Sequence, residues 1–283
     1  MKIALLLLSL LLSLEAKILV HGHRGARAAR PENSIAAFEY AIAQGADFLE
    51  LDLAVTKDNV LVVSHDPQLN PAICMAPAGL PLVIRESTLA QIKQWDCGSK
   101  RNPEFPQQQT IPGTRIPTFD EVLALAPKGN FGFNVETKSS ASKPQLTPPP
   151  AEFARMVLDA VQKHKLESRV IIQSFDWRTL TELRKLSPTL HLSALHPTGM
   201  AEAVVKLDYV QAAKDLGIDM VSPHYRLTTK ARVDEAHAAG MKVVPWTAND
   251  VKIWDQLIAD GVDAIITDDP AALIAHLKAK GLR

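Results

Sequence analysis

Histidines, carboxylates and basic side chains gather between residues 20 and 66, a stretch that begins VHGHRGARAARPENS. Within it, Glu50 and Asp52 lie one residue apart in the strand-like run FLELDLAVT. Because side chains alternate between the two faces of a strand, both carboxylates point the same way. Two like charges at that range repel each other unless a cation or a proton lies between them. The spacing therefore predicts a cation site, with a half-exposed strand that has a solvated acidic face as the structural alternative.

Two histidines and an arginine flank these carboxylates. His23 and Arg24 precede them in the chain, and His65 follows them in VLVVSHDP. Imidazole gains and loses a proton near neutral pH, so the two histidines can act as an acid–base pair. A guanidinium group suits a phosphate, because it donates two parallel hydrogen bonds. The flanking groups favour proton transfer on a phosphate substrate over a merely solvated strand.

A second pair of charged groups, Glu136 and Lys138, occurs at positions i and i+2 in NVETK. We predict that Glu136 joins Glu50 and Asp52 as a metal ligand. An all-oxygen set of this kind selects a hard cation, Ca²⁺ or Mg²⁺, over zinc. Three carboxylates also leave coordination positions open for water or a substrate oxygen. Lys138 supplies a second positive charge for a phosphate.

These residues lie far apart in the sequence and need a fold that brings strand ends together. Strand-like and helix-like stretches alternate along the chain, which predicts an α/β fold of the (β/α)8 TIM-barrel type. An open doubly wound sheet is the alternative, but no GxGxxG motif follows the first strand. The predicted barrel strands are 17–22, 47–55, 130–137, 168–174, 190–195, 218–222, 241–246 and 262–267. The predicted helices are 33–44, 118–126, 151–165, 176–187, 201–216, 228–239, 250–260 and 270–281.

Two irregular stretches interrupt this alternation. Residues 67–117 contain both cysteines, Cys74 and Cys97, and are predicted to be an insertion after the second strand, preceded by a hairpin strand at 59–64. The stretch 139–150 is rich in proline and follows the third strand. Such connections emerge at the carboxyl face of a barrel, so we expect both to overhang the pocket. The two cysteines are either a local disulfide or a pair of buried thiols.

The N-terminal residues 1–16 are predicted to be a secretory signal peptide, with an uncleaved anchor as the alternative. Their apolar run is too short to span a membrane, so the mature domain, 17–283, is expected to have no stable membrane insertion. The expected location is periplasmic or secreted. Apolar residues make up 47% of the chain and its formal net charge is zero. The neutral charge argues against a nucleic-acid partner.

The motifs HRG, PENS, ELD, SHDP and NVETK, in this order and spacing, resemble those of the glycerophosphodiester phosphodiesterase family. Later stretches, QSF at 173–175, PWT at 245–247 and ITDDP at 266–270, also resemble barrel strands of that family. The resemblance covers most of the mature chain. It implies an enzyme, a phosphoric diester hydrolase that releases glycerol 3-phosphate and an alcohol from a small glycerophosphodiester.

The resemblance also implies a role for each of the residues above. A divalent cation held by the three carboxylates binds the phosphate and a hydroxyl of the glycerol. This hydroxyl attacks phosphorus to give a cyclic phosphate, which water then opens. One histidine is the base and the other the acid, in an order that the motifs leave open. The implied residues are His23 and His65 for catalysis, Arg24 and Lys138 for the phosphate, and Glu50, Asp52 and Glu136 for the metal.

Weaker candidates have structural alternatives. Trp246 can pack against the glycerol backbone of the substrate or belong to the core. Glu32 can orient the arginine of HRG, and Asn33 or Ser34 is expected to be a helix N-cap rather than a ligand. We expect His21 to be a packed side chain.

Two other functions are compatible with these motifs. The first is a lysophospholipase D-like hydrolase on the same barrel, which would need a continuous apolar groove for an acyl chain. The second is a non-catalytic protein that binds glycerophosphodiesters, which would have no need of both histidines and all three carboxylates. The head group, the choice between Ca²⁺ and Mg²⁺ and the oligomeric state are left open.

Overall fold

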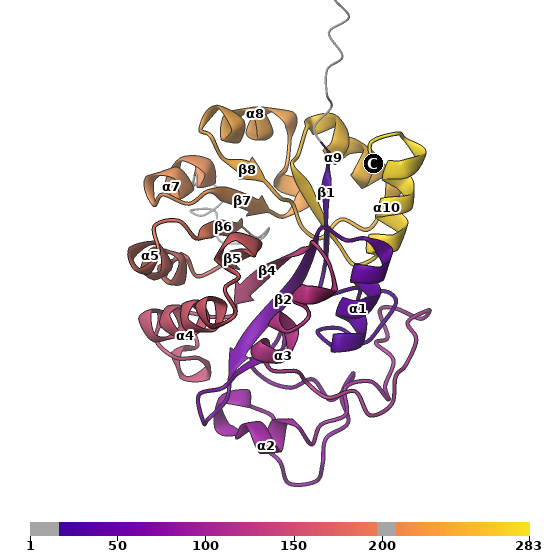
Figure 1. Cartoon of the computed structure of the whole chain (residues 1–283), viewed down its shortest axis with the longest axis vertical. Helices are drawn as coiled ribbons and strands as arrows, with labels where there is room; N and C mark the ends of the chain where they lie inside the picture. The colour runs from indigo at the N-terminus through magenta and orange to yellow at the C-terminus, as the bar shows by residue number, and fades with distance from the viewer. Residues whose placement is uncertain (1–16, 197–207) are drawn as a thin grey trace, which may run out of the picture.

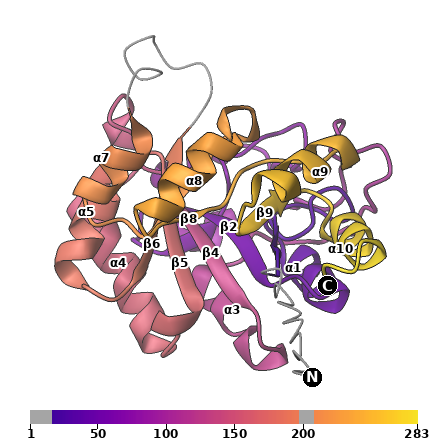
Figure 2. The same ribbon diagram turned by 90° about the horizontal axis from the view of Figure 1, so that it is seen from above.

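The computed structural model describes residues 17–196 and 208–283 and has the predicted barrel architecture (Figures 1 and 2). Neighbouring strands pair in parallel in the order β8-β7-β6-β5-β4-β2-β1-β9. A further strand, β3, pairs antiparallel with β2, as the predicted hairpin requires. The strands are β1 (Leu19–Gly22), β2 (Phe48–Val55), β3 (Leu61–Val63), β4 (Gly132–Thr137), β5 (Val170–Ser174), β6 (His191–His196), β7 (Met220–Pro223), β8 (Lys242–Val243) and β9 (Ala264–Thr267).

The barrel closes between its first and last strands in the sheet order, β8 and β9. The amide of Asp263 donates to the carbonyl of Val243 at 3.1 Å, and the amide of Ile266 donates to the carbonyl of Pro245 at 3.0 Å. Proline has no N–H to donate, so Pro245 interrupts regular pairing. This explains why β8 has two residues where the sequence predicted a strand over 241–246.

Helices cover the outside of the barrel, as Figure 1 shows. The first begins at Ser34, whose hydroxyl accepts a hydrogen bond from the amide of Ala37 at 3.1 Å, so Ser34 rather than Asn33 is the N-cap. The helix predicted at 118–126 is shorter in the structure, where it runs over Phe119–Leu123. Part of the helix predicted at 201–216 lies outside the described residues. The helices are α1 (Ile35–Gln44), α2 (Leu89–Ile92), α3 (Phe119–Leu123), α4 (Pro150–Lys163), α5 (Trp177–Leu186), α7 (Tyr209–Asp215), α8 (Lys230–Ala238), α9 (Val251–Asp260) and α10 (Pro270–Ala279).

Strand β2 is buried on both of its faces. Leu49, Leu51 and Leu53 belong to the main apolar core shared with the helices. Glu50 and Asp52 point into the barrel and are buried as well. The alternative of a half-exposed strand with a solvated acidic face is therefore wrong.

The interior of the barrel has two layers. A separate apolar cluster includes Ile171, Met220 and Ala264, which lie at or next to the first residues of β5, β7 and β9. The charged groups come later in their strands, towards the carboxyl ends. The apolar layer thus forms a floor, and the polar chemistry lies above it at the face where barrels build their sites.

The stretch between β3 and α3 has a small core of its own. It contains the short helices η1 (Ile84–Glu86) and α2, and Trp95 is fully buried within it. Cys74 and Cys97 form a disulfide, which decides between the two predicted states of the cysteines. This stretch lies on the side of the barrel that carries α1 and α3 (Figure 1).

The predicted signal peptide, residues 1–16, lies outside the described part of the chain. Within residues 17–196 and 208–283, no helix combines the length and apolar character needed to cross a bilayer.

Candidate active site

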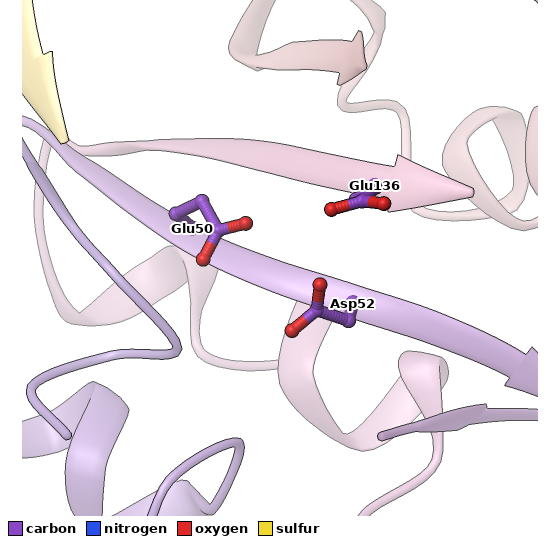
Figure 3. A group of neighbouring side chains, drawn as sticks. All are labelled: Glu50, Asp52 and Glu136. Atoms are coloured by element: carbon purple, nitrogen blue, oxygen red, sulfur yellow. The ribbon is translucent and has the colours of Figure 1, made fainter. Parts of the chain in front are cut away.

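Three buried carboxylates converge at the carboxyl end of the barrel. Glu50 and Asp52 extend from β2, and Glu136 extends from β4, whose register pairs it with Asp52. One oxygen from each lies within 4.8 Å of the others, and Figure 3 shows the three groups facing one another across adjacent strands. This spacing brings together carboxylates that are far apart in the chain, and it suits joint binding of one hard cation.

The three carboxylates repel one another when they are charged, and a bound cation would relieve this repulsion. Burial, together with the charge of Asp52, raises the pKa of Glu50 well above its usual value. Burial also raises the pKa of Glu136, although Lys138 opposes that rise. Burial acts on Asp52 too, but His65 and other nearby cations outweigh it and lower its pKa. Oδ1 of Asp52 is buried and accepts no hydrogen bond, so a ligand position is free. The residues therefore fit a divalent metal ion.

Each carboxylate is held by a different donor. Oε2 of Glu50 accepts from the backbone amide of Arg24 at 2.8 Å, and Oδ2 of Asp52 accepts from Nδ2 of Asn33 at 2.9 Å. Nζ of Lys138 lies 2.9 Å from Oε1 of Glu136. The donors fix the carboxylates before any cation binds, which lowers the cost of ordering a site.

Arg24 and Asn33 share a backbone conformation that is rare for side-chain-bearing residues. Their φ angles are 49° and 53°, in the left-handed region, and the amide of Asn33 donates to the carbonyl of Arg24 at 3.0 Å. The turn aims the guanidinium of Arg24 at Glu32, with Nη1 2.6 Å from Oε1. The predicted role of Glu32 in orienting Arg24 agrees with this contact.

His23 is largely buried beside Asp268, the residue that follows the last strand. Its Nδ1 lies 2.5 Å from Oδ1 of Asp268, and its Nε2 lies 4.0 Å from Oε2 of Glu50. Asp268 also accepts from Nδ2 of Asn249 at 2.7 Å. Burial lowers the pKa of His23, against the opposing effect of the Asp268 charge. One ring nitrogen is thus engaged by Asp268, while the other faces the carboxylates.

His65 reaches the same pocket from the loop after β3. Its Nδ1 lies 2.8 Å from Oδ1 of Asp66, its neighbour in the chain. Both side chains are partly exposed, so His65 is held less tightly than His23.

A pocket of about 220 Å³ joins these groups. Its aromatic wall consists of Phe175 and Trp246, whose rings meet edge to face with centroids 5.3 Å apart. The indole N–H of Trp246 donates to the carbonyl of Ser222 at 2.8 Å, which fixes that wall. The residues that line the pocket are His23, Arg24, Arg27, Glu50, His65, Glu136, Gln173, Phe175, Leu195, Trp246, Thr247 and Ile266.

Most of the predicted site residues therefore meet in one place. Asp52 and Lys138 do not line the pocket themselves but adjoin a residue that does. Nζ of Lys138 contacts Oε1 of Glu136 and lies 3.8 Å from Oδ1 of Asp52. Neither long stretch, 67–117 or 139–150, supplies a residue to this lining, whereas we expected both to overhang it. His21 is buried and packs against Phe48, as predicted.

Several residues at the site were not among the predicted ones. The most important are Asp268, which binds His23, and Gln173, whose Nε2 donates to Oε1 of Glu50 at 2.9 Å. Both lie in stretches, ITDDP and QSF, that end barrel strands. Placement at a strand end was therefore a usable signal for them. Phe175 and Arg27 were also missed as members of the site. Asn33 was expected to be a helix N-cap but instead donates to Asp52, and Asn249, which was given no role, donates to Asp268.

Comparison with known proteins agrees with this geometry. The model of the glycerophosphoryl diester phosphodiesterase family matches residues 23–272. A glycerophosphodiester phosphodiesterase from Caldanaerobacter subterraneus subsp. tengcongensis is 34% identical over 265 residues, 94% of this chain and 99% of that protein. Another from Bacillus subtilis is 31% identical over 266 residues, 90% of this chain and 84% of that protein.

A solved structure shows the same fold. It is from Silicibacter pomeroyi, carries a provisional assignment as a glycerophosphoryl diester phosphodiesterase, and superposes with a TM-score of 0.86 at 30% identity. The superposition covers 94% of this chain and 95% of that one. The chain belongs to the glycerophosphoryl diester phosphodiesterase family. Membership confirms the predicted barrel, the resemblance seen in the motifs and the predicted class of enzyme.

Proposed function

We propose that this protein hydrolyses small glycerophosphodiesters to glycerol 3-phosphate and an alcohol, with a divalent cation as cofactor. The observation that carries the proposal is the convergence of three buried carboxylates beside a pocket that two histidines line. A protein that only bound the substrate would not need two proton-transfer groups beside a metal site.

Glu50, Asp52 and Glu136 would hold the cation, and their oxygens suit Ca²⁺ or Mg²⁺. When bound, the cation polarises a phosphate oxygen and lowers the pKa of a glycerol hydroxyl. Arg24 and Lys138 supply positive charge beside the carboxylates, where they stabilise the negative charge that grows on the phosphate.

His23 acts as the general base. Its Nδ1–H is engaged by Asp268, so its Nε2 carries the lone pair and faces Glu50 across 4.0 Å. Nε2 takes the proton from the glycerol hydroxyl, whose oxygen attacks phosphorus. A new P–O bond closes the cyclic phosphate, and the P–O bond to the departing alcohol breaks.

His65 acts as the general acid. It lies in the pocket lining but is partly open to solvent, where a departing alcohol can leave. It gives its proton to that alcohol and later takes one from the water that attacks the cyclic phosphate. In that second step the P–O bond to the attacking glycerol oxygen breaks, and His23 returns its proton to that oxygen. Trp246 and Phe175 pack against the glycerol backbone, since they offer an apolar wall beside the charged groups.

The export of the protein is a separate part of the proposal. The disulfide between Cys74 and Cys97 supports a periplasmic or secreted location, because such bonds persist in oxidising compartments. We further propose that residues 17–283 form one catalytic domain and that residues 67–117 are an insertion within it.

An assay of product release tests the proposed activity. The purified protein is incubated with glycerophosphocholine, glycerophosphoethanolamine or lysophosphatidylcholine, with and without a chelator, and glycerol 3-phosphate and free alcohol are measured. We expect release from the first two substrates, loss of release with the chelator, and recovery with added Ca²⁺ or Mg²⁺. Release from lysophosphatidylcholine alone would instead favour the lysophospholipase D-like function. Full activity in metal-stripped protein would overturn the proposed cation site.

A further inference from the structure

A chain of buried polar side chains runs across the barrel interior and ends on Glu50. It starts at His21 on β1, passes through Asn134 on β4 and Gln173 on β5, and reaches Glu50 on β2. These four strands are neighbours in the sheet. All four side chains are almost completely buried. Buried amides are costly unless they are paired. Both ends of the Gln173 amide and Nδ2 of Asn134 are paired within this chain, whereas Oδ1 of Asn134 accepts no hydrogen bond.

The hydrogen bonds of the chain have a fixed direction. Nε2 of Gln173 donates to Oε1 of Glu50 at 2.9 Å, which leaves Oε1 of Gln173 as an acceptor. That oxygen accepts from Nδ2 of Asn134 at 3.1 Å. Nδ2 of Asn134 also lies 3.2 Å from Nδ1 of His21, which must then carry a lone pair. Nδ2 of Asn134 therefore donates in both directions, to His21 and to Gln173, and the donor of Gln173 is in turn aimed at Glu50.

His21 suits the far end of this chain. Burial lowers its pKa to about 3, so the ring is neutral at physiological pH and can accept a hydrogen bond. It is held in place by Phe48, with ring centroids 4.5 Å apart. The chain thus begins at a packed side chain rather than at solvent.

Glu50 is consequently held from two sides. Gln173 binds Oε1 from within the barrel, and the backbone amide of Arg24 binds Oε2 at 2.8 Å from the loop above. Each carboxylate oxygen has two lone pairs, so both remain able to bind a metal. We propose that Gln173, supported by Asn134 and His21, is a positioning residue that orients Glu50 and sets the affinity of the cation site. This inference rests on the proposed cation site.

Calorimetric titration of the metal-free full chain with CaCl₂ and with MgCl₂ tests this role without measuring turnover. Gln173→Met keeps the length of the side chain and removes the donor to Glu50. We expect its cation affinity to fall about 10- to 100-fold, the range found when a group that supports a metal ligand is lost. Asn134→Leu removes the next link and should weaken binding by a smaller factor. It also provides the test if Gln173→Met does not fold.

Ser193→Ala is the matched control. It breaks another buried hydrogen bond of the barrel, between Ser193 and Ser222 at 2.7 Å. Ser193 lies beside Gln173 in the register of β5 and β6, so this change disturbs the same region while the hydrogen bonds that lead to Glu50 stay intact. We expect its cation affinity to equal that of the unaltered protein. Equal loss of affinity in Ser193→Ala would overturn the inference, because any loosening of the barrel would then have the same effect.

Glu50→Gln separates the failure of this inference from the failure of the proposed function. If the unaltered protein binds no cation, the proposed cation site is wrong and the inference falls with it. If the unaltered protein binds and Glu50→Gln does not, the site stands. Unchanged affinity in folded Gln173→Met and Asn134→Leu then overturns the positioning role alone.

Discussion

The loops after β1 and β3 each present a histidine beside an aspartate, but the two pairs are built differently. The His23 side chain is 13% exposed and its partner, Asp268, is 245 residues away in the chain and 8% exposed. The His65 side chain is 32% exposed and its partner is the next residue, Asp66, which is 54% exposed. A partner from a distant strand ties His23 to the barrel, whereas a neighbouring partner ties His65 only to its own loop.

This difference supports the proposed division of the two proton-transfer roles. A base must be fixed against the attacking hydroxyl, and the largely buried His23, held by Asp268, meets that need. The acid must follow a departing alcohol whose size varies between substrates, and the looser His65 at the pocket edge can do so. In the proposed mechanism, the same residue types would thus serve two tasks because their surroundings differ.

The largest effect is expected for His23→Ala. Loss of the base should lower kcat on glycerophosphocholine by about 10⁴-fold, the upper end of the usual acid–base contribution. A substrate with p-nitrophenol as its alcohol should not restore the rate, because the attacking hydroxyl still lacks a base. The measurement is steady-state release of the alcohol from both substrates, and a near-normal rate in folded His23→Ala would remove this residue from the mechanism.

His65→Ala should be the next most severe change. We expect kcat on glycerophosphocholine to fall about 10²- to 10³-fold, because choline leaves poorly without a proton. The p-nitrophenyl substrate should recover most of this loss, since p-nitrophenolate leaves without help. If that substrate rescues His23→Ala instead, the two roles are reversed.

Asp268→Asn tests whether the distant partner positions His23. The amide keeps the shape of Asp268 but no longer favours Nδ1–H on the ring, so Nε2 loses its lone pair in part of the population. We expect kcat to fall roughly 10²-fold with little change in KM, the scale of a misplaced catalytic group.

Asp66→Asn is the matched change at the other histidine. An exposed pair contributes at most about 1 kcal/mol, so kcat should change less than about fivefold. Equal losses in Asp66→Asn and Asp268→Asn would remove the distinction between the two loops.

The smallest effect on turnover is expected from removing the disulfide. Cys74→Ser with Cys97→Ser opens a loop with a sequence separation of 23 and should lower the free energy of unfolding by about 3 kcal/mol. The rate should stay within a few fold, because neither cysteine lines the pocket that holds the carboxylates. Denaturant unfolding measures the change in stability, and the release assay measures the change in rate. A loss of turnover as large as that of His65→Ala would show that the disulfide shapes the active site.

The convergence of the three carboxylates could be predicted from the sequence because much of it depends on local periodicity. Glu50 and Asp52 share a face through the period of two in a strand, and parallel register then places Glu136 beside Asp52. The barrel itself follows from the alternation of strands and helices.

The groups that hold the site could not be predicted in the same way. Gln173 is 123 residues from Glu50, and Asp268 is 245 residues from His23. Such pairs depend on which strands become neighbours and on the direction of each side chain, and no local pattern carries that information. Strand β8 ends early for a local reason, because Pro245 cannot donate a backbone hydrogen bond. The strand predicted at 241–246 did not take this proline into account.

The most direct measurement is the position of a bound Mn²⁺ ion in a crystal, found by its anomalous scattering. We predict one ion within about 2.0–2.6 Å of an oxygen from each of Glu50, Asp52 and Glu136, the range for hard cations on oxygen ligands. An ion bound elsewhere in the pocket, or one that Glu136 does not reach, would contradict this account.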